Sequence, residues 1–235
     1  MFKHHALQSV KELRNAQQKI QTLNDWGYSS IKVGASNTLC QYVIPKALSS
    51  FYDKEKRCEV FINSEDTKSL AKRLSNGSLD IAFGVRLNSL EHDYKFTSLA
   101  SDELCFVTTP DHPWCTTPPT TIEQFEKERF IIYGNDSVTQ DILSSHLSGI
   151  GIRQRSTLSM NNMESIKEMA ALGIGVGIVA PWVAKADCEK KTLAMHPISP
   201  APQREWGYYV SKSKSLSLPE EDFVKCFHAQ LNNII

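Results

Sequence analysis

Apolar residues follow two different spacings along this chain, one in the first 28 residues and another beyond them. Over residues 3–24, small and apolar side chains recur at intervals of three and four positions, the heptad pattern of a helix with one narrow apolar stripe. The stripe consists of Ala6, Ser9, Leu13, Ala16, Ile20 and Leu23. Because alanine and serine make this stripe weak, we expect the helix to pack against a second copy of itself or against the body of the protein.

Beyond residue 28, short apolar runs alternate with amphipathic helical patterns. Strands are predicted at 31–35, 58–62 and 79–84, where β-branched and aromatic residues gather. Helices are predicted between them, one from residue 36 or 37 to about 52 and one opening at 66–67. This strand–helix–strand–helix–strand order indicates a parallel sheet with right-handed crossovers.

The second half of the chain repeats this alternation after a break. A longer strand is predicted over 96–108, and Pro110, Pro113, Pro118 and Pro119 follow it. We interpret this proline-rich stretch as the crossing from one lobe to a second lobe. The later strands are predicted at 129–133, 154–158, 175–179, 193–196 and 206–210. The later helices are predicted at 121–126, 138–148, 162–172, from 181 onward, and at 219–231.

Composition and charge narrow the functional classes. The chain has 26 basic and 26 acidic residues, and it shows no concentrated basic face of the kind that holds DNA. Its six cysteines form no CxxC pair and have no histidine at zinc-ligand spacing, so we expect reduced thiols and no metal. No apolar stretch reaches the roughly 18 residues of a membrane span, and no signal peptide opens the chain. We therefore expect a soluble cytoplasmic protein that contacts no membrane.

The sequence contains no recognisable motif of catalysis or cofactor binding. GxSxG and HExxH patterns do not occur, and the seven histidines are dispersed. Gly173, Gly175 and Gly177 follow a predicted helix and precede a predicted strand, the reverse of the order in a dinucleotide-binding motif. We therefore expect no cofactor, no catalytic residues and no enzymatic activity.

Four stretches carry a resemblance to a known family. They are Ile31-Lys32-Val33-Gly34-Ala35-Ser36 with the following Val43-Ile44-Pro45; Thr67 to Gly77-Ser78-Leu79-Asp80; Met163-Glu164-Ser165-Ile166 to Ala180-Pro181; and Arg204-Glu205-Trp206-Gly207-Tyr208. Together, over nearly the whole chain, they resemble the effector-binding domain of LysR-type transcriptional regulators. The heptad helix resembles the linker helix of that family. The third stretch, taken with the final strand and helix, is the most specific.

The resemblance implies an α/β fold of the type-2 periplasmic-binding-protein kind. Two Rossmann-like lobes would be joined by two crossover strands and preceded by an N-terminal linker helix. Residues 1–28 would form the linker or dimerisation helix, residues 29–108 with 206–235 lobe I, and residues 109–205 lobe II. The effector would lie in the cleft between the lobes.

The chain departs from the family pattern at its start, where no winged helix-turn-helix precedes the linker. We therefore expect this chain to bind a small-molecule effector and to form a homodimer or homotetramer. It would reach DNA only through a winged helix-turn-helix that is absent from this chain.

Candidate effector-binding residues lie where predicted strands give way to helices. Ligands of open α/β sheets bind beyond the carboxyl ends of the strands, where helix N-termini offer free N–H groups to anions. The candidates at these positions are Ser36, Asn37, Thr38, Thr67, Gly134, Asn135, Asn161, Asn162 and Met163. They favour a small anionic metabolite. The alternative is that these residues only cap helices or form tight turns, and the sequence leaves both interpretations open.

Other functions remain as alternatives to effector sensing. A solute-binding protein of the same fold would need a secretion signal or a lipid-anchor cysteine, which the start of the chain does not show. An enzyme is a less favoured alternative. A redox sensor would use a cysteine pair, for which Cys105 and Cys115 are the candidates because they flank the proposed crossing.

Overall fold

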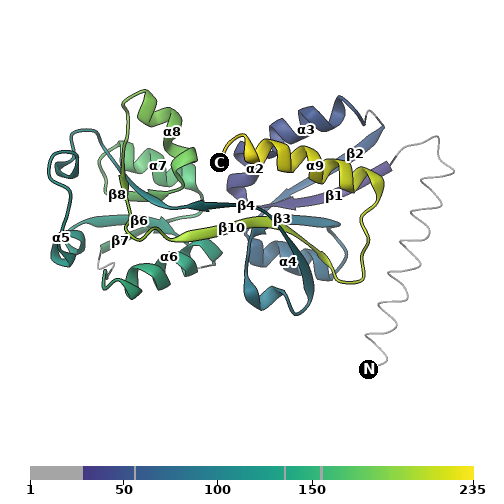
Figure 1. The fold of residues 1–235 in the computed structure, drawn as a ribbon, viewed down its shortest axis with the longest axis horizontal. Coiled ribbons are helices and arrows are strands. Elements are labelled where there is room, and N and C mark those ends of the chain that lie inside the picture. The colour runs from purple at the N-terminus through teal and green to yellow at the C-terminus, as the bar shows by residue number, and fades with distance from the viewer. Residues whose placement is uncertain (1–28, 56, 135, 154–155) are drawn as a thin grey trace.

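The computed structural model describes residues 29–235 except residues 56, 135, 154 and 155. The heptad helix predicted over residues 3–24 lies outside the described residues. Two five-stranded sheets lie end to end, and helices cover the faces of each sheet (Figure 1). This is the two-lobed α/β architecture that the sequence predicts.

The sheet of lobe I has the strand order β2-β1-β3-β10-β4. Its strands are β1 (Ser29–Ala35), β2 (Cys58–Ser64), β3 (Ile81–Val85), β4 (Tyr94–Glu103) and β10 (Gln203–Ser211). The first three run parallel, whereas β10 runs antiparallel to β3 and β4. Helix α4 (Thr67–Ser75) covers one face, and α3 (Ile44–Tyr52) and α9 (Leu218–Asn232) cover the other (Figure 1). Because both faces are covered, every residue of β3 is buried.

The sheet of lobe II has the strand order β7-β6-β8-β5-β9. Its strands are β5 (Cys105–Thr108), β6 (Arg129–Tyr133), β7 (Ser156–Met160), β8 (Val176–Val179) and β9 (Ala194–Pro197). Its helices are α5 (Ile122–Glu126), α6 (Val138–Gly149), α7 (Met163–Ala171) and α8 (Pro181–Glu189). Strands β6, β7 and β8 are parallel, and β5 is antiparallel to β8 and β9. Two short 3₁₀ helices complete the described elements, Asn88–Leu90 in lobe I and Pro113–Cys115 in lobe II.

Each lobe has its own apolar core. In lobe I the rings of Phe83 and Phe227 stack at 3.9 Å, which fixes α9 on the sheet. In lobe II the ring of Phe106 packs against those of Trp114 and Phe130. Val138 of α6 joins the core of lobe I, and Tyr42 packs against the core of lobe II, so the two lobes also pack against each other.

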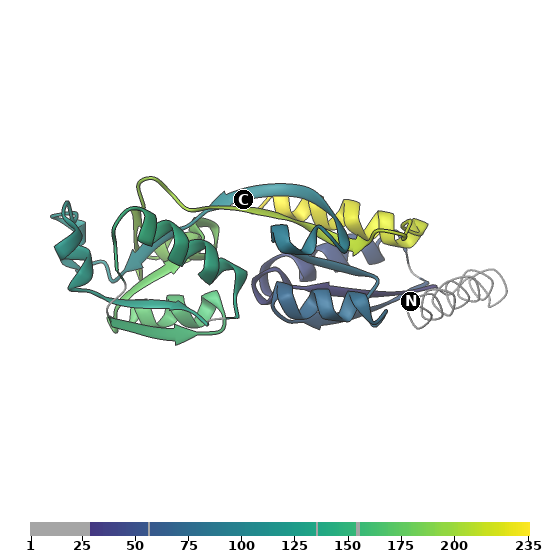
Figure 2. The same ribbon diagram turned by 90° about the horizontal axis from the view of Figure 1, so that it is seen from below.

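Two strand segments connect the lobes. Strand β4 passes into β5 through the single residue Leu104, and β10 returns alongside β4 (Figure 2). The structure thus has two strands where we predicted one over 96–108. It also differs from the lobe boundary predicted at 108/109, because β5 already pairs with β8 and β9 of the second sheet. On the return, Gln203 already pairs with Glu103, before the predicted position 206. The prolines mark the loop after β5 and not the crossing itself.

The helix predicted from residue 36 or 37 to about 52 is two helices, α2 (Asn37–Tyr42) and α3. Pro45 explains the break, because it has no N–H to donate to the carbonyl of Gln41 and its ring clashes with that carbonyl. The bend at Val43 leaves α2 as a short helix. Its first residues lie at the cleft, and Tyr42 at its end contacts lobe II.

Candidate functional site

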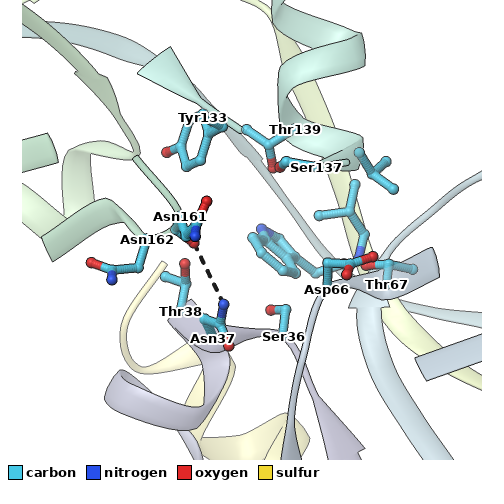
Figure 3. A pocket seen from close by; sticks show the side chains of 13 residues that line it. Ser36, Asn37, Thr38, Asp66, Thr67, Tyr133, Ser137, Thr139, Asn161 and Asn162 are labelled. Carbon is cyan, nitrogen blue, oxygen red and sulfur yellow. Dashed lines mark hydrogen bonds between the residues drawn. The ribbon is translucent and has the colours of Figure 1, made fainter. Parts of the chain in front are cut away.

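A cleft of about 70 Å³ lies between the lobes (Figure 3). Its lining comes from both lobes: Ser36, Asn37, Thr38, Asp66, Thr67, Val85 and Trp206 from lobe I, and Tyr133, Ser137, Val138, Thr139, Asn161 and Asn162 from lobe II. This volume is small compared with the pockets that hold drug-sized ligands. A ligand enclosed in this state is therefore small.

Four helices begin at the cleft, two from each lobe. Helices α2 and α4 follow β1 and β2 in lobe I, and α6 and α7 follow β6 and β7 in lobe II. In a parallel sheet each helix begins near the carboxyl end of the preceding strand, so these four starts gather where the two sheets face each other. Helix N-termini carry partial positive charge and favour ligands that accept hydrogen bonds.

Three buried polar atoms of the cleft have no hydrogen-bond partner. They are the hydroxyl of Ser36, the hydroxyl of Tyr133 and the indole Nε1 of Trp206, and among the described residues they are the only buried side-chain nitrogen or oxygen atoms without a partner. Each such group costs about 1–3 kcal/mol when left unpaired. Their gathering at one place is typical of a site that a ligand completes.

The neighbouring polar side chains already accept hydrogen bonds from the protein. The hydroxyl of Thr67 accepts from the backbone N–H of Val85 at 3.3 Å, and the hydroxyl of Thr139 accepts from Nη1 of Arg204 at 3.2 Å. A hydroxyl that accepts in this way keeps its proton for donation. Burial raises the pKa of Tyr133, so its hydroxyl also stays protonated. The cleft therefore offers mainly donors.

Asp66 is the one charged side chain among the described residues that line the cleft. Its Oδ1 accepts from the backbone N–H groups of Lys68 and Ser69, at 2.8 and 3.0 Å, and its Oδ2 accepts from the hydroxyl of Ser69. The carboxylate is thus occupied as the N-cap of α4. Recognition in this cleft would rely on neutral donors and helix starts.

Six of the nine predicted site residues line the cleft: Ser36, Asn37, Thr38, Thr67, Asn161 and Asn162. Gly134 and Met163 do not. Gly134 lies next to Asn161, where a Cβ would come within 3.0 Å of the amide oxygen, and Met163 is buried in the core of lobe II. Asn135 lies outside the described residues. These six residues lie at the cleft, and contact between any of them and a ligand stays a prediction.

One of the predicted site residues caps a helix with its side chain. Asn162 is the N-cap of α7, and its side chain accepts from the backbone N–H of Ser165 at 2.8 Å. The α4 cap is Asp66 and not Thr67. Ser36 occupies the N-cap position of α2 but makes no side-chain capping bond. Its hydroxyl is therefore available to a ligand.

The prediction from sequence missed seven lining residues: Asp66, Val85, Tyr133, Ser137, Val138, Thr139 and Trp206. Tyr133 and Ser137 flank a turn that the sequence singled out, so the end of a predicted strand was a usable signal for them. Trp206 belongs to a crossing strand, and no local pattern marks the face of that strand that meets the cleft.

Direct contacts join the lobes beside the cleft. The hydroxyl of Tyr42 donates to Oε2 of Glu164, and Lys68 pairs with Asp141 at 2.9 Å. Burial, together with the bond to Glu164, raises the pKa of Tyr42 to about 12, so this hydroxyl is a donor across the neutral pH range. The amide of Asn37 also donates to the backbone oxygen of Asn161 at 3.5 Å (Figure 3). These contacts join the two lobes at the edge of the cleft.

Residues 29–232 match the family model of the LysR substrate binding domain. The chain belongs to this family. Among its curated relatives is the uncharacterized HTH-type transcriptional regulator YwqM of Bacillus subtilis, 26% identical over 67% of this chain and 54% of that protein. Another is a probable RuBisCO transcriptional regulator of Trieres chinensis, 25% identical over 68% of this chain and 54% of that protein. The LysR-family chain thus spans about half the length of these curated relatives.

Solved structures share the fold of this LysR substrate-binding domain. The effector binding domain of QuiR in complex with shikimate matches with a TM-score of 0.74 at 18% identity, covering 88% of this chain and 100% of that one. The CcmR regulatory domain of Synechocystis PCC6803 in complex with 2-PG matches with a TM-score of 0.76 at 21% identity, covering 86% and 96%. The predicted family and fold class are confirmed.

Three further observations bear on alternatives for this LysR-family chain. None of the helices within the described part of the chain has the length and apolar character needed to cross a membrane. The described His, Cys, Asp and Glu side chains form no group of three that could hold a metal ion. Cys105 is buried in β5, where burial raises its thiol pKa to about 12, whereas Cys115 is exposed. A thiol held protonated in this way reacts poorly, which weighs against the cysteine-pair hypothesis.

Proposed function

We propose that this chain is the effector-sensing part of a LysR-type transcriptional regulator and binds a small anionic metabolite in the cleft between its lobes. One observation carries the proposal: the unpaired buried atoms belong to Ser36, Tyr133 and Trp206, three residues that line the same cleft. The indole N–H can only donate, so the missing partner must accept hydrogen bonds. The QuiR and CcmR domains hold shikimate and 2-PG in the same fold, which supports a small metabolite as the ligand.

The size and chemistry of the cleft narrow the ligand class. The small volume of the cleft favours a short carboxylate or an inorganic oxyanion. Such ligands consist mostly of acceptor oxygens, which match the donors of the cleft. No histidine or cysteine is among the described lining residues, so the site offers no obvious nucleophile–base pair. This supports a sensor and not an enzyme.

The sensing role also implies partners. We propose that the chain forms a homodimer or homotetramer and that ligand binding shifts the relative placement of the lobes. DNA would be read by a winged helix-turn-helix elsewhere in the regulator. Relatives named as transcriptional regulators, of which the matched region covers 54%, support this arrangement.

The proposal is tested by titrating the chain with glycolate, sulfate and phosphate while its thermal stability is followed. A ligand that binds only the folded state adds about 2.7 kcal/mol at a hundredfold excess over its Kd. In Tyr133→Phe, which removes one unpaired hydroxyl, we expect affinity to fall about tenfold with no loss of stability.

Tyr94→Phe is the matched control. The hydroxyl of Tyr94 is buried but donates to the backbone oxygen of Ala71 at 2.8 Å, away from the cleft. Its removal should lower stability by about 1 kcal/mol and leave ligand affinity unchanged. If none of the three anions binds, or if both variants behave alike, the proposed site is wrong.

A further inference from the structure

A buried arginine lies directly behind the cleft without lining it. The side chain of Arg204 is 0% exposed, and its Nε and Nη2 donate to the two carboxylate oxygens of Asp102 at 2.9 and 2.5 Å. Its Nη1 donates to Thr139, and its Cζ lies 4.7 Å from the ring centre of Trp206. Arg204 therefore contacts two residues that do line the cleft, one from each lobe.

We propose that Arg204 is a positioning residue that sets the specificity of the cleft by turning Thr139 and Trp206 into oriented donors toward the ligand. The proposal rests on the proposed function of the cleft as an effector site. Arg204 would thus favour ligands with acceptor groups without contacting the ligand itself.

Thr139 shows how this works at one side of the cleft. A guanidinium has only donors, so the hydroxyl of Thr139 must accept the bond from Arg204. The hydroxyl proton is then left to donate elsewhere. Because Thr139 lines the cleft and is otherwise buried, a ligand acceptor is the available partner.

Trp206 shows the same effect at the other side. A guanidinium over an aromatic face is attracted by the ring electrons and holds the ring in place. The indole N–H is one of the unpaired buried atoms of the cleft. Arg204 thus supports two donors that approach the ligand from different lobes.

Asp102 completes the arrangement and links it to the lobe crossing. Asp102 is the next-to-last residue of β4 and Arg204 is the second residue of β10, so the ion pair lies where the chain crosses between the lobes. Trp182 of α8 also donates to Asp102, at 2.8 Å, and its ring meets that of Tyr42 edge-on at 5.5 Å. Because Asp102 neutralises the charge of Arg204, the cleft receives directed donors and not a net cation. Selection should therefore depend on where the ligand accepts hydrogen bonds.

The test compares glycolate with glycolamide, two ligands of nearly equal size that differ in a carboxylate and an amide. Dissociation constants are measured for the wild-type chain, Arg204→Lys, Thr139→Val and the double variant. Each single variant should weaken glycolate about tenfold and glycolamide about threefold or less, because a bond to a charged acceptor is the stronger one. In the double variant, the fold loss of glycolate affinity should be smaller than the product of the two single-variant losses, since Arg204 acts partly through Thr139. Thr139→Ser, which keeps the hydroxyl, should stay within about twofold of wild type.

Lys214→Met is the control for a purely structural loss. Lys214 pairs with Asp80 and Glu220 in lobe I, away from the cleft, so its removal should lower stability and leave both dissociation constants unchanged. Equal weakening of glycolate and glycolamide in Arg204→Lys, or additive effects in the double variant, would overturn the positioning role.

Two outcomes separate this inference from the proposed function. If glycolate binds wild type but the glycolate-to-glycolamide ratio is unchanged in Thr139→Val, the effector site stands and the positioning role is overturned. If Arg204→Lys does not fold, Thr139→Val and Thr139→Ser still decide. If glycolate does not bind wild type at all, the short-carboxylate site fails and the positioning role fails with it.

Discussion

The four helix starts at the cleft fall into two kinds, and each lobe has one of each. Helices α4 and α7 are capped by the side chains of Asp66 and Asn162, which accept from backbone N–H groups of the first turn. Helices α2 and α6 have Ser36 and Ser137 at the same position, and neither side chain makes a capping bond. The capped starts stabilise the fold, whereas the uncapped starts leave donors open to a ligand. Polar residues at equivalent N-cap positions thus differ in whether they bond to the helix that they precede.

The largest difference between capped and uncapped helix starts is expected when the cap of α4 is removed. Asp66→Ala should lower the free energy of unfolding by about 2 kcal/mol, because the carboxylate accepts from two backbone N–H groups next to the positive helix end. Anion affinity should stay equal or rise, since a negative charge leaves the cleft. Chemical denaturation and glycolate titration measure the two effects. Asp66→Asn should keep most of the cap, and a loss below about 0.5 kcal/mol in Asp66→Ala would contradict the structural role.

Removal of the uncapped hydroxyl should have the opposite pattern. Ser36→Ala should weaken anion binding about tenfold and leave stability equal or slightly higher, because the lost group is buried and unpaired. Calorimetric titration and thermal unfolding check the pair of results. Ser217→Ala offers the contrast, since Ser217 forms a capping box with Glu220 at the start of α9. It should cost about 1 kcal/mol of stability without changing affinity. Unchanged affinity in Ser36→Ala would place the ligand elsewhere.

The smallest effect is expected at the cap of α7. Asn162→Ala should lower stability by about 1 kcal/mol, because one capping bond to Ser165 is lost. Its effect on affinity should be smaller than that of Ser36→Ala, since its side-chain oxygen is already occupied. Asn162→Asp retains an acceptor and serves as the control in the same denaturation series. A larger affinity loss than in Ser36→Ala would erase the distinction between capped and uncapped starts.

Much of the fold follows from local patterns, and the errors have local causes. The alternation of apolar runs and amphipathic segments predicts β1, β2 and β3 with the helices between them. The helix predicted to about residue 52 runs through Pro45, and this proline divides it into α2 and α3. The predicted crossing lies too late in the chain, because the prolines mark a loop after β5. The chain changes sheets at Leu104, where no residue type marks the change. The strands with which β4 and β5 pair determine the position of the crossing.

The sequence by itself determined the class of fold, the order of its elements and six residues of the cleft, because strand ends and helix starts carry their own polar residues. Only the tertiary structure decided which of those residues have spare hydrogen-bonding capacity. That capacity depends on partners far along the chain, such as Arg204 for Thr139, 65 positions away. The tertiary structure also places Trp206 of the returning strand β10 at the cleft. Local chemistry fixes what a side chain can bond, and packing fixes whether the bond is already made.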